Sequence, residues 1–224
     1  MSAKKYPKWL PPVAFVGFLA LALLLSNQPA PAPQGGTMIT SDAEYDAAKR
    51  KMEDLSLPIL QAHQTGKTLS ADELKKLREA GEIVDKMILY SPVLTGLHFL
   101  SGKIHHILGE DTIAQDRFKQ CTLVSANEIT QHPDQKAPIE QTVAECNYQL
   151  SEIQLLRRQI NEALASADAA AKAFPNSSEY LTARASALNE LRRTEEAKKD
   201  LAQALKLDPS NSRARGLLRL LSRP

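Results

Sequence analysis

The sequence predicts an all-α protein whose helices form stacked antiparallel pairs. Aromatic residues make up only 5% of the chain, so its core must rest on aliphatic side chains and alanine, which favours closely packed helices over sheets. Prolines also recur at positions 175 and 209, a spacing of 34. The same spacing separates three pairs of alanines: Ala80 and Ala114, Ala163 and Ala197, and Ala170 and Ala204. Close packing of two helices needs such small residues at regular positions.

The overall composition excludes several functional classes. The formal net charge is +2, without the clustered basic face that a nucleic-acid-binding protein needs. Two cysteines are too few for a disulfide framework or a structural zinc site. The sequence contains no glycine-rich phosphate loop, no HExxH motif and no nucleophile elbow. We therefore expect neither an enzyme nor a bound cofactor.

Residues 1–40 have the pattern of a membrane anchor followed by a linker. Residues 1–8 are basic, and residues 9–25 form an apolar run that contains no charge. At ~1.5 Å per residue, such a run reaches the short end of a bilayer span. Residues 26–40 are rich in Pro, Ala and Gly, which is typical of a linker. We predict a transmembrane signal-anchor at 9–25, connected by the linker 26–40 to the rest of the chain.

Two alternatives to the anchor remain open. The segment could be a signal peptide cleaved after Ala30-Pro31-Ala32, although Pro33 would then follow the cut, or it could be a buried helix of a soluble domain. If it is an anchor, its orientation follows from the basic residues, since three lysines precede the run and the next Lys or Arg is Lys49. The positive-inside rule then places residues 1–8 in the cytoplasm and the remainder on the extracytoplasmic side, which is the periplasm in a bacterium.

The sequences around the two prolines are similar to each other: AAAKAFPNSSEY and AQALKLDPSNSR. This pattern resembles the tetratricopeptide repeat (TPR), whose unit is two antiparallel helices with a period of about 34 residues. The first unit matches the family order of large and small residues at His98, Gly102, His105, Gly109, Ala114, Phe118 and Cys121. The last matches at Leu181, Ala185, Leu188, Ala197, Leu201, Ala204 and Pro209. The middle unit is weaker in its first helix, at Asn147, Ser151 and Gln154, and matches again at Ala163, Ala167, Ala170 and Pro175.

The resemblance implies a TPR-like α-solenoid of the membrane-anchored bacterial type. Its repeats fall at 95–128, 144–177 and 178–211. A degenerate helix pair at 41–92 precedes them, with a capping box at Ser70 and Glu73 and a kink or break expected at Pro58. Residues 129–143 are an insertion, which we interpret as a longer loop plus an extended start to the next helix. Residues 212–222 are expected to cap the array; because this helix is basic and amphipathic, docking onto lipid is the alternative.

Three histidines, His98, His105 and His106, lie close enough in sequence to suggest a metal site. His98 and His105 fall at positions where the family packs a large residue between helices, and no carboxylate or cysteine converges on them. We therefore interpret them as packed side chains and expect no metal. Cys121 and Cys146 end one unit and begin the next, so they could form a disulfide outside the cytoplasm or remain two small buried residues.

The resemblance also implies where a partner would bind, because the first helix of each unit lines the concave face of such arrays. The corresponding groove positions are Phe99, Lys103, His106, Tyr148, Glu152, Leu155, Thr182, Ser186 and Asn189. They lack the set of Lys, Arg and Asn that holds a C-terminal carboxylate in one branch of the family. An extended peptide or a partner helix would suit this surface, although these residues could also merely cover the groove.

The function expected from this organisation is a membrane-tethered scaffold or assembly factor that binds a partner protein on the extracytoplasmic side. The alternatives are a periplasmic accessory module that binds a small molecule or a metal, and a structural membrane protein that assembles with copies of itself.

Overall fold

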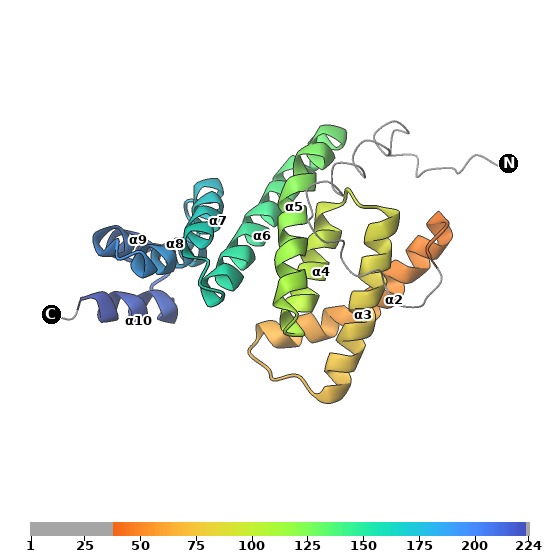
Figure 1. Ribbon diagram of the computed structural model, residues 1–224, viewed down its shortest axis with the longest axis horizontal. Helices are drawn as coiled ribbons and strands as arrows, with labels where there is room; N and C mark the ends of the chain where they lie inside the picture. The colour runs from red at the N-terminus through yellow and green to blue at the C-terminus, as the bar shows by residue number, and fades with distance from the viewer. Residues whose placement is uncertain (1–37, 223–224) are drawn as a thin grey trace. The chain divides into compact units, whose positions relative to one another are not determined.

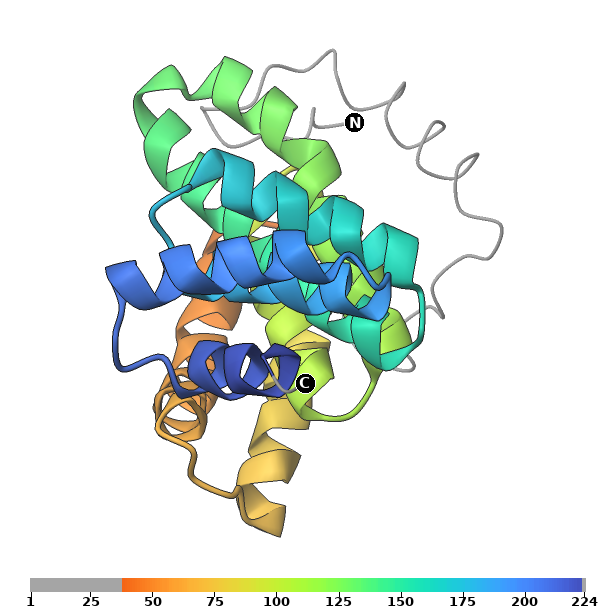
Figure 2. The ribbon, with the colours of Figure 1, turned by 90° about the vertical axis from the view of Figure 1, so that its left-hand side faces the viewer.

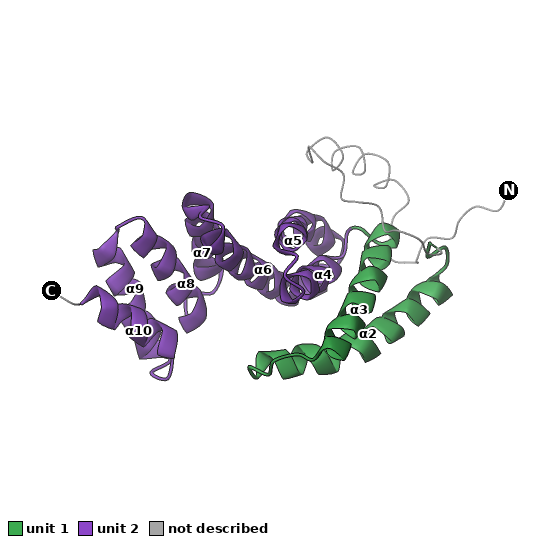
Figure 3. Ribbon diagram, turned by 60° about the horizontal axis from the view of Figure 1, so that its bottom comes forward, with its two compact units in different colours: residues 1–92 green, residues 93–224 purple. Residues whose placement is uncertain are grey.

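The computed structural model describes residues 38–222, in which every regular element is a helix, and this confirms the all-α prediction (Figure 1). The predicted anchor at 9–25 and most of the linker lie outside the described residues. No helix among residues 38–222 is long and apolar enough to cross a membrane. The chain divides into two compact units, residues 1–92 and residues 93–224, which Figure 3 shows in different colours.

The first unit is a pair of packed helices, α2 (Asp42–Gln64) and α3 (Ala71–Tyr90). The capping box is present, because the Ser70 hydroxyl accepts the Glu73 N–H and the Glu73 carboxylate accepts the Ser70 N–H. The expected break at Pro58 does not occur, since α2 continues through it to Gln64. Pro58 removes one helical hydrogen bond, but Ser56 and Ile59 on either side of it are buried, and their packing holds the helix together.

The second unit contains three helix pairs and a final single helix. The pairs are α4 (Thr95–Ile107) with α5 (Asp111–Gln131), α6 (Lys136–Leu156) with α7 (Ile160–Ala173), and α8 (Ser178–Glu190) with α9 (Thr194–Leu207). Figure 2 shows α10 (Ser212–Leu221), in dark blue, at the end of the array, where it packs against α8 and α9. The first helices also contact one another in sequence, α4 with α6, α6 with α8, and α8 with α10. We call the surface that these four helices share the A-helix face.

The turn between the two helices of each pair has the same geometry in all three repeats. The N–H groups of Glu110, Gln159 and Arg193 donate to carbonyls five residues earlier, at 2.8, 2.9 and 2.9 Å. The residue before each donor is left-handed: Gly109 (φ 76°), Arg158 (φ 60°) and Arg192 (φ 60°). These are the bonds of a helix C-terminal Schellman motif, so the repeat is preserved in backbone hydrogen bonds where its side chains differ.

The insertion contains no long loop, but the extended start to the next helix that was expected there is present. Residues 129–143 form the end of α5, a short 3₁₀ turn, η1 (Pro133–Gln135), and the first two turns of α6. The extensions of α5 and α6 are helical because each of them contributes a buried side chain. Ile139 is 6% exposed, and the buried Glu128 carboxylate accepts the Thr95 N–H at 2.8 Å, which caps α4 where Leu94 offers no side-chain cap.

Candidate functional site

The A-helix face contains a cavity of about 410 Å³ that three helices and one turn build together. Its lining comes from α4, α6, the turn after α6, and α10: His106, Glu152, Leu155, Leu156, Arg158 and Arg213. We call it the A-face pocket. Two leucines give it an apolar wall, and Arg158, Arg213 and Glu152 give it charge, a mixture that suits the side chains of a partner segment.

Arg213 of α10 joins two of the other first helices. Its guanidinium donates two hydrogen bonds to the Glu152 carboxylate of α6, at 2.5 and 2.9 Å, and a longer one of 3.3 Å to the Ser186 hydroxyl of α8. Burial lowers the pKa of Arg213, but the hydrogen bonds to Glu152, the charge of Glu152 and the neighbouring Tyr148 together outweigh it, so the pKa is raised. Because both charges are paired and partly buried, the geometry of this bidentate contact is well defined.

Two tyrosines continue the face beyond this ion pair. The rings of Tyr148 on α6 and Tyr180 on α8 have centroids 5.5 Å apart, and the Tyr180 hydroxyl donates to Glu145 at 3.1 Å. Burial, and then the negative charge of Glu152, raise the pKa of Tyr148 to about 12. Burial raises the pKa of Tyr180 as well, so both tyrosines are neutral at physiological pH. The half-buried ring of Tyr148 lies against the buried ring of Tyr180.

The remaining polar groups of the A-face pocket are each bonded to a carboxylate. The Nδ1 atom of His106 lies 2.8 Å from the Asp111 carboxylate, and Arg158 donates from Nη1 to Glu190 at 2.9 Å. The Arg158 side chain is nevertheless 77% exposed, so its charge faces solvent at the mouth of the pocket.

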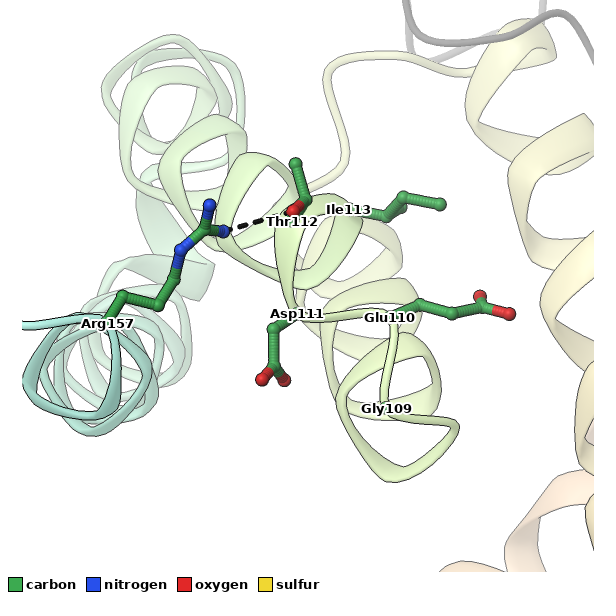
Figure 4. Close-up of a pocket in the computed structure, with 6 residues that line it drawn as sticks. All are labelled: Gly109, Glu110, Asp111, Thr112, Ile113 and Arg157. Atoms are coloured by element: carbon green, nitrogen blue, oxygen red, sulfur yellow. Dashed lines mark hydrogen bonds between the residues drawn. The ribbon is translucent and has the colours of Figure 1, made fainter.

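A second cavity of about 400 Å³ lies at the turn between α4 and α5 (Figure 4). Gly109, Glu110, Asp111, Thr112 and Ile113 form one side, and Arg157 at the end of α6 forms the other. Figure 4 shows the Arg157 guanidinium reaching the Thr112 hydroxyl, to which it donates at 3.1 Å. This hydrogen bond connects the first repeat to the second, so Arg157 has a structural role.

The structure brings together five of the nine predicted groove residues. His106, Glu152 and Leu155 line the A-face pocket, and Ser186 and Tyr148 adjoin it. Phe99 and Lys103 pair separately on α4, where the Lys103 ammonium lies 5.4 Å from the Phe99 ring centroid. Asn189 is half-buried near the end of α8.

Thr182 is inaccessible to a partner, because it is 1% exposed and its hydroxyl accepts a hydrogen bond from Asn211. Asn211 is the N-cap of α10, and it also donates to Ser178, so it fixes α10 against α8. The groove prediction for Thr182 is therefore wrong, since α10 covers this part of the face.

Three residues of the A-face pocket were absent from the sequence prediction: Leu156, Arg158 and Arg213. The repeat period contains the signal that finds Arg213, because Ser212 lies one full period after Ser178, the first residue of α8. The last helix therefore occupies the register of a further first helix, and Arg213 falls on the A-helix face.

His98, His105 and both cysteines are residues of the core, whereas His106 lines the A-face pocket. His98 and His105 are 3% and 8% exposed, and His105 Nδ1 lies 2.5 Å from the Glu110 carboxylate. Among residues 38–222, no group of three or more His, Cys, Asp or Glu side chains could hold a metal ion. Cys121 and Cys146 form a disulfide that joins α5 to α6, with Cα atoms 6.5 Å apart.

Comparison with known proteins finds the same architecture. Residues 178–211 match the family model of the tetratricopeptide repeat. A structure of MamA, from residue 41 to its end, from Desulfovibrio magneticus RS-1 has a TM-score of 0.50 and 14% identity, covering 76% of this chain and 83% of that one. TTC0263, a thermophilic TPR protein of Thermus thermophilus, has a TM-score of 0.50 and 16% identity, covering 80% of this chain and 89% of that one. No curated protein matches the chain.

At these identities the solved structures establish the fold, and the family model identifies the last repeat. The chain therefore carries a tetratricopeptide repeat at residues 178–211 and has the fold of tetratricopeptide-repeat proteins.

Proposed function

We propose that this protein is an interaction scaffold that binds a segment of a partner protein on its A-helix face. The observation that carries the proposal is the A-face pocket, where the exposed Leu156 and the half-buried Leu155 at the end of α6 lie beside side chains of α4 and α10. Stacked helical repeats present such surfaces to peptides and to partner helices, because each first helix contributes side chains at regular spacing.

We further propose that the scaffold is tethered to a membrane by residues 9–25 and acts on the extracytoplasmic side. The apolar run, the lysines before it and the linker after it support the anchor and its orientation. The disulfide between Cys121 and Cys146 supports an oxidising compartment, since such bonds are rare in the cytosol.

The binding proposal is tested by affinity purification of the full chain from gently solubilised membranes after cross-linking. Leu156→Asp changes a side chain that is 72% exposed in the A-face pocket. Leu123→Asp is the matched control, because Leu123 is 58% exposed on α5 and lies outside the pocket. We expect the same partner with the natural chain and with Leu123→Asp, and its loss with Leu156→Asp. Recovery of no reproducible partner, or equal recovery with both variants, would count against the proposal.

The tether is tested separately. We expect the full chain to stay with membranes through an alkaline carbonate wash, and a protease added on the extracytoplasmic side to cut the linker. Deletion of residues 9–25 should release the protein. A chain that leaves the membrane in carbonate, or whose mature N-terminus lies after Ala32, would exclude an uncleaved anchor.

A further inference from the structure

We infer that a basic side chain of the partner segment binds over the ring of Tyr148, between the carboxylates of Glu145 and Glu179. This inference rests on the proposed function and gives the partner a chemistry. The three residues lie on α6 and α8, which contact each other, and we call them the aromatic-acidic site. The site shares no residue with the lining of the A-face pocket.

The repeat register places the two carboxylates on neighbouring helices of one face. Glu145 and Glu179 are 34 residues apart, so they hold the same position on α6 and α8. Glu145 reaches from one helix to the other, because its carboxylate accepts a hydrogen bond of 3.1 Å from the Tyr180 hydroxyl. A further period along the chain is Arg213 of α10, which bonds to Glu152 on the A-helix face. The two carboxylates therefore belong to this face as well.

Neither carboxylate is neutralised by a cation of the chain. Glu145 accepts hydrogen bonds from two uncharged groups, a tyrosine hydroxyl and the Gln149 amide, and no ion pair to it or to Glu179 occurs in the described part of the chain. Glu152 differs, because Arg213 compensates its charge. Glu179 is exposed and Glu145 is half-buried, so a partner can reach both. The aromatic-acidic site therefore carries two uncompensated negative charges, which a basic partner would neutralise.

Tyr148 supplies an aromatic surface beside these charges. Its ring is half-buried, and its centroid lies 5.5 Å from that of Tyr180. Counted back from the equivalent turn residues, Phe99 holds the same position in the first repeat, and the Lys103 ammonium lies 5.4 Å from its ring centroid. The second repeat has Glu152 at the position of Lys103. The face of an aromatic ring attracts a cation, and here the cation would come from the partner.

The carboxylates are close enough to act on the Tyr148 ring. Burial is the main cause that raises the pKa of Tyr148, and the charge of Glu152 is the next, partly opposed by Arg213. The negative charges of Glu179 and Glu145 raise this pKa further. An electrostatic field that disfavours a negative tyrosinate favours a positive side chain at the same place.

The guanidinium of an arginine fits all three parts of the site. It is planar, so it can stack on the Tyr148 ring, and its five N–H groups can donate to two carboxylates at once. An acidic side chain would instead approach Glu145 and Glu179, and such like-charge contacts lower affinity for the wrong partner. Affinity should therefore fall from a positive to a neutral to a negative side chain.

The experiment uses the full chain in micelles of an uncharged detergent and three libraries of immobilised dodecapeptides. Their flanks are randomised among uncharged residues, and both ends are blocked by acetylation and amidation. The central residue is arginine, glutamate or citrulline, which has the shape of arginine without its charge. We expect the arginine library to bind about tenfold more tightly than the citrulline library, and the glutamate library to bind most weakly.

Two double variants locate this preference on the molecule. Glu145→Gln/Glu179→Gln removes both charges and keeps the shape of each side chain, so the preference for arginine over citrulline should disappear. Glu162→Gln/Glu195→Gln is the matched control, because it changes the net charge equally at two exposed glutamates of the second helices α7 and α9. The control should keep the preference. Thermal denaturation followed by circular dichroism confirms that both variants fold.

Equal binding of the arginine and citrulline libraries, or an unchanged preference in Glu145→Gln/Glu179→Gln, would overturn the inference. Loss of the preference in the control as well would assign it to net charge rather than to this site, and failure of all three libraries to bind would also overturn the inference. The scaffold proposal is decided separately, by recovery of a partner from membranes and by its loss with Leu156→Asp.

Discussion

A Cβ atom on Gly102 of α4 would lie 2.6 Å from Cε1 of Phe118 on α5. The Phe118 ring is fully buried, and it occupies the space that a side chain at position 102 would need. The two helices of the first repeat can therefore pack closely, because Gly102 has no side chain and the Phe118 ring fills the space beside it. This is the small-against-large packing that the repeat pattern implied.

Gly102→Ala should therefore destabilise the protein. The added methyl group must displace a fully buried ring, at an expected cost of about 1–3 kcal/mol in the free energy of unfolding. Gly96→Ala is the control in the same helix, because a Cβ there meets nothing within 4 Å. Urea denaturation of the two variants tests the prediction. Equal stabilities would mean that Phe118 moves aside without cost.

The disulfide should make a measurable contribution to stability. Cys121 and Cys146 are fully buried, with a sequence separation of 25. Closing a loop of this size is expected to stabilise the folded state by about 2–4 kcal/mol, because it restricts the unfolded chain. Urea denaturation with and without a reductant should reveal the difference, and the double variant Cys121→Ala/Cys146→Ala should not respond to the reductant. Two free thiols in unreduced peptides, found by mass spectrometry, would rule out the bond.

The regular part of this fold could be predicted from the sequence, because alanines that let helices pack closely recur at a spacing of 34, and prolines at 175 and 209 follow the last two helix pairs. Pro58 and the insertion were predicted less well. Whether a helix survives a proline, or continues through extra residues, depends on what its neighbours bury, as Ile59 and Ile139 show. Such burial is a tertiary property that local sequence does not reveal.

The candidate site was predicted only where it lies on the helices of recognised repeats. His106, Glu152 and Leu155 were found by register alone. The contact between Glu152 and Arg213 spans 61 positions, and it depends on α10 occupying the register of a further first helix. The role of Arg158 depends on a left-handed turn that an arginine adopts only rarely, so no residue preference pointed to it.

The left-handed turns lead to a paired prediction on stability. Arg192 has φ 60°, and a residue with a Cβ is disfavoured there by about 1 kcal/mol. Arg192→Gly should therefore raise the free energy of unfolding by about 0.5–1 kcal/mol. Gly109→Ala should lower it by a similar amount, because φ is 76° and a Cβ there meets nothing within 4 Å, which leaves backbone strain as the cause. Thermal denaturation followed by circular dichroism measures both, and shifts of the same sign would refute the argument.

The elevated pKa of Tyr148 predicts a pH dependence at the alkaline end. Burial and then Glu152 raise this pKa from an ordinary value of 10.0 to about 12, so the folded state holds the phenol proton more tightly than the unfolded chain does. The stability that follows is fully present below pH 10 and is lost as the pH rises from there towards 12. Tyr148→Phe has no proton to lose at this position. It should therefore lose less stability than the natural chain over this interval, measured by urea denaturation at successive pH values.

Glu152→Gln separates the two causes of this shift. The variant removes a negative charge near the phenol while leaving the ring buried, so the pKa of Tyr148 should fall part of the way back towards 10.0. Ultraviolet absorbance of tyrosinate measures the titration, and subtraction of the curve of the corresponding Tyr148→Phe chain isolates Tyr148 from the other tyrosines. An unchanged pKa in Glu152→Gln would mean that burial alone sets the titration of Tyr148, and that the charge at the edge of the A-face pocket does not reach the ring.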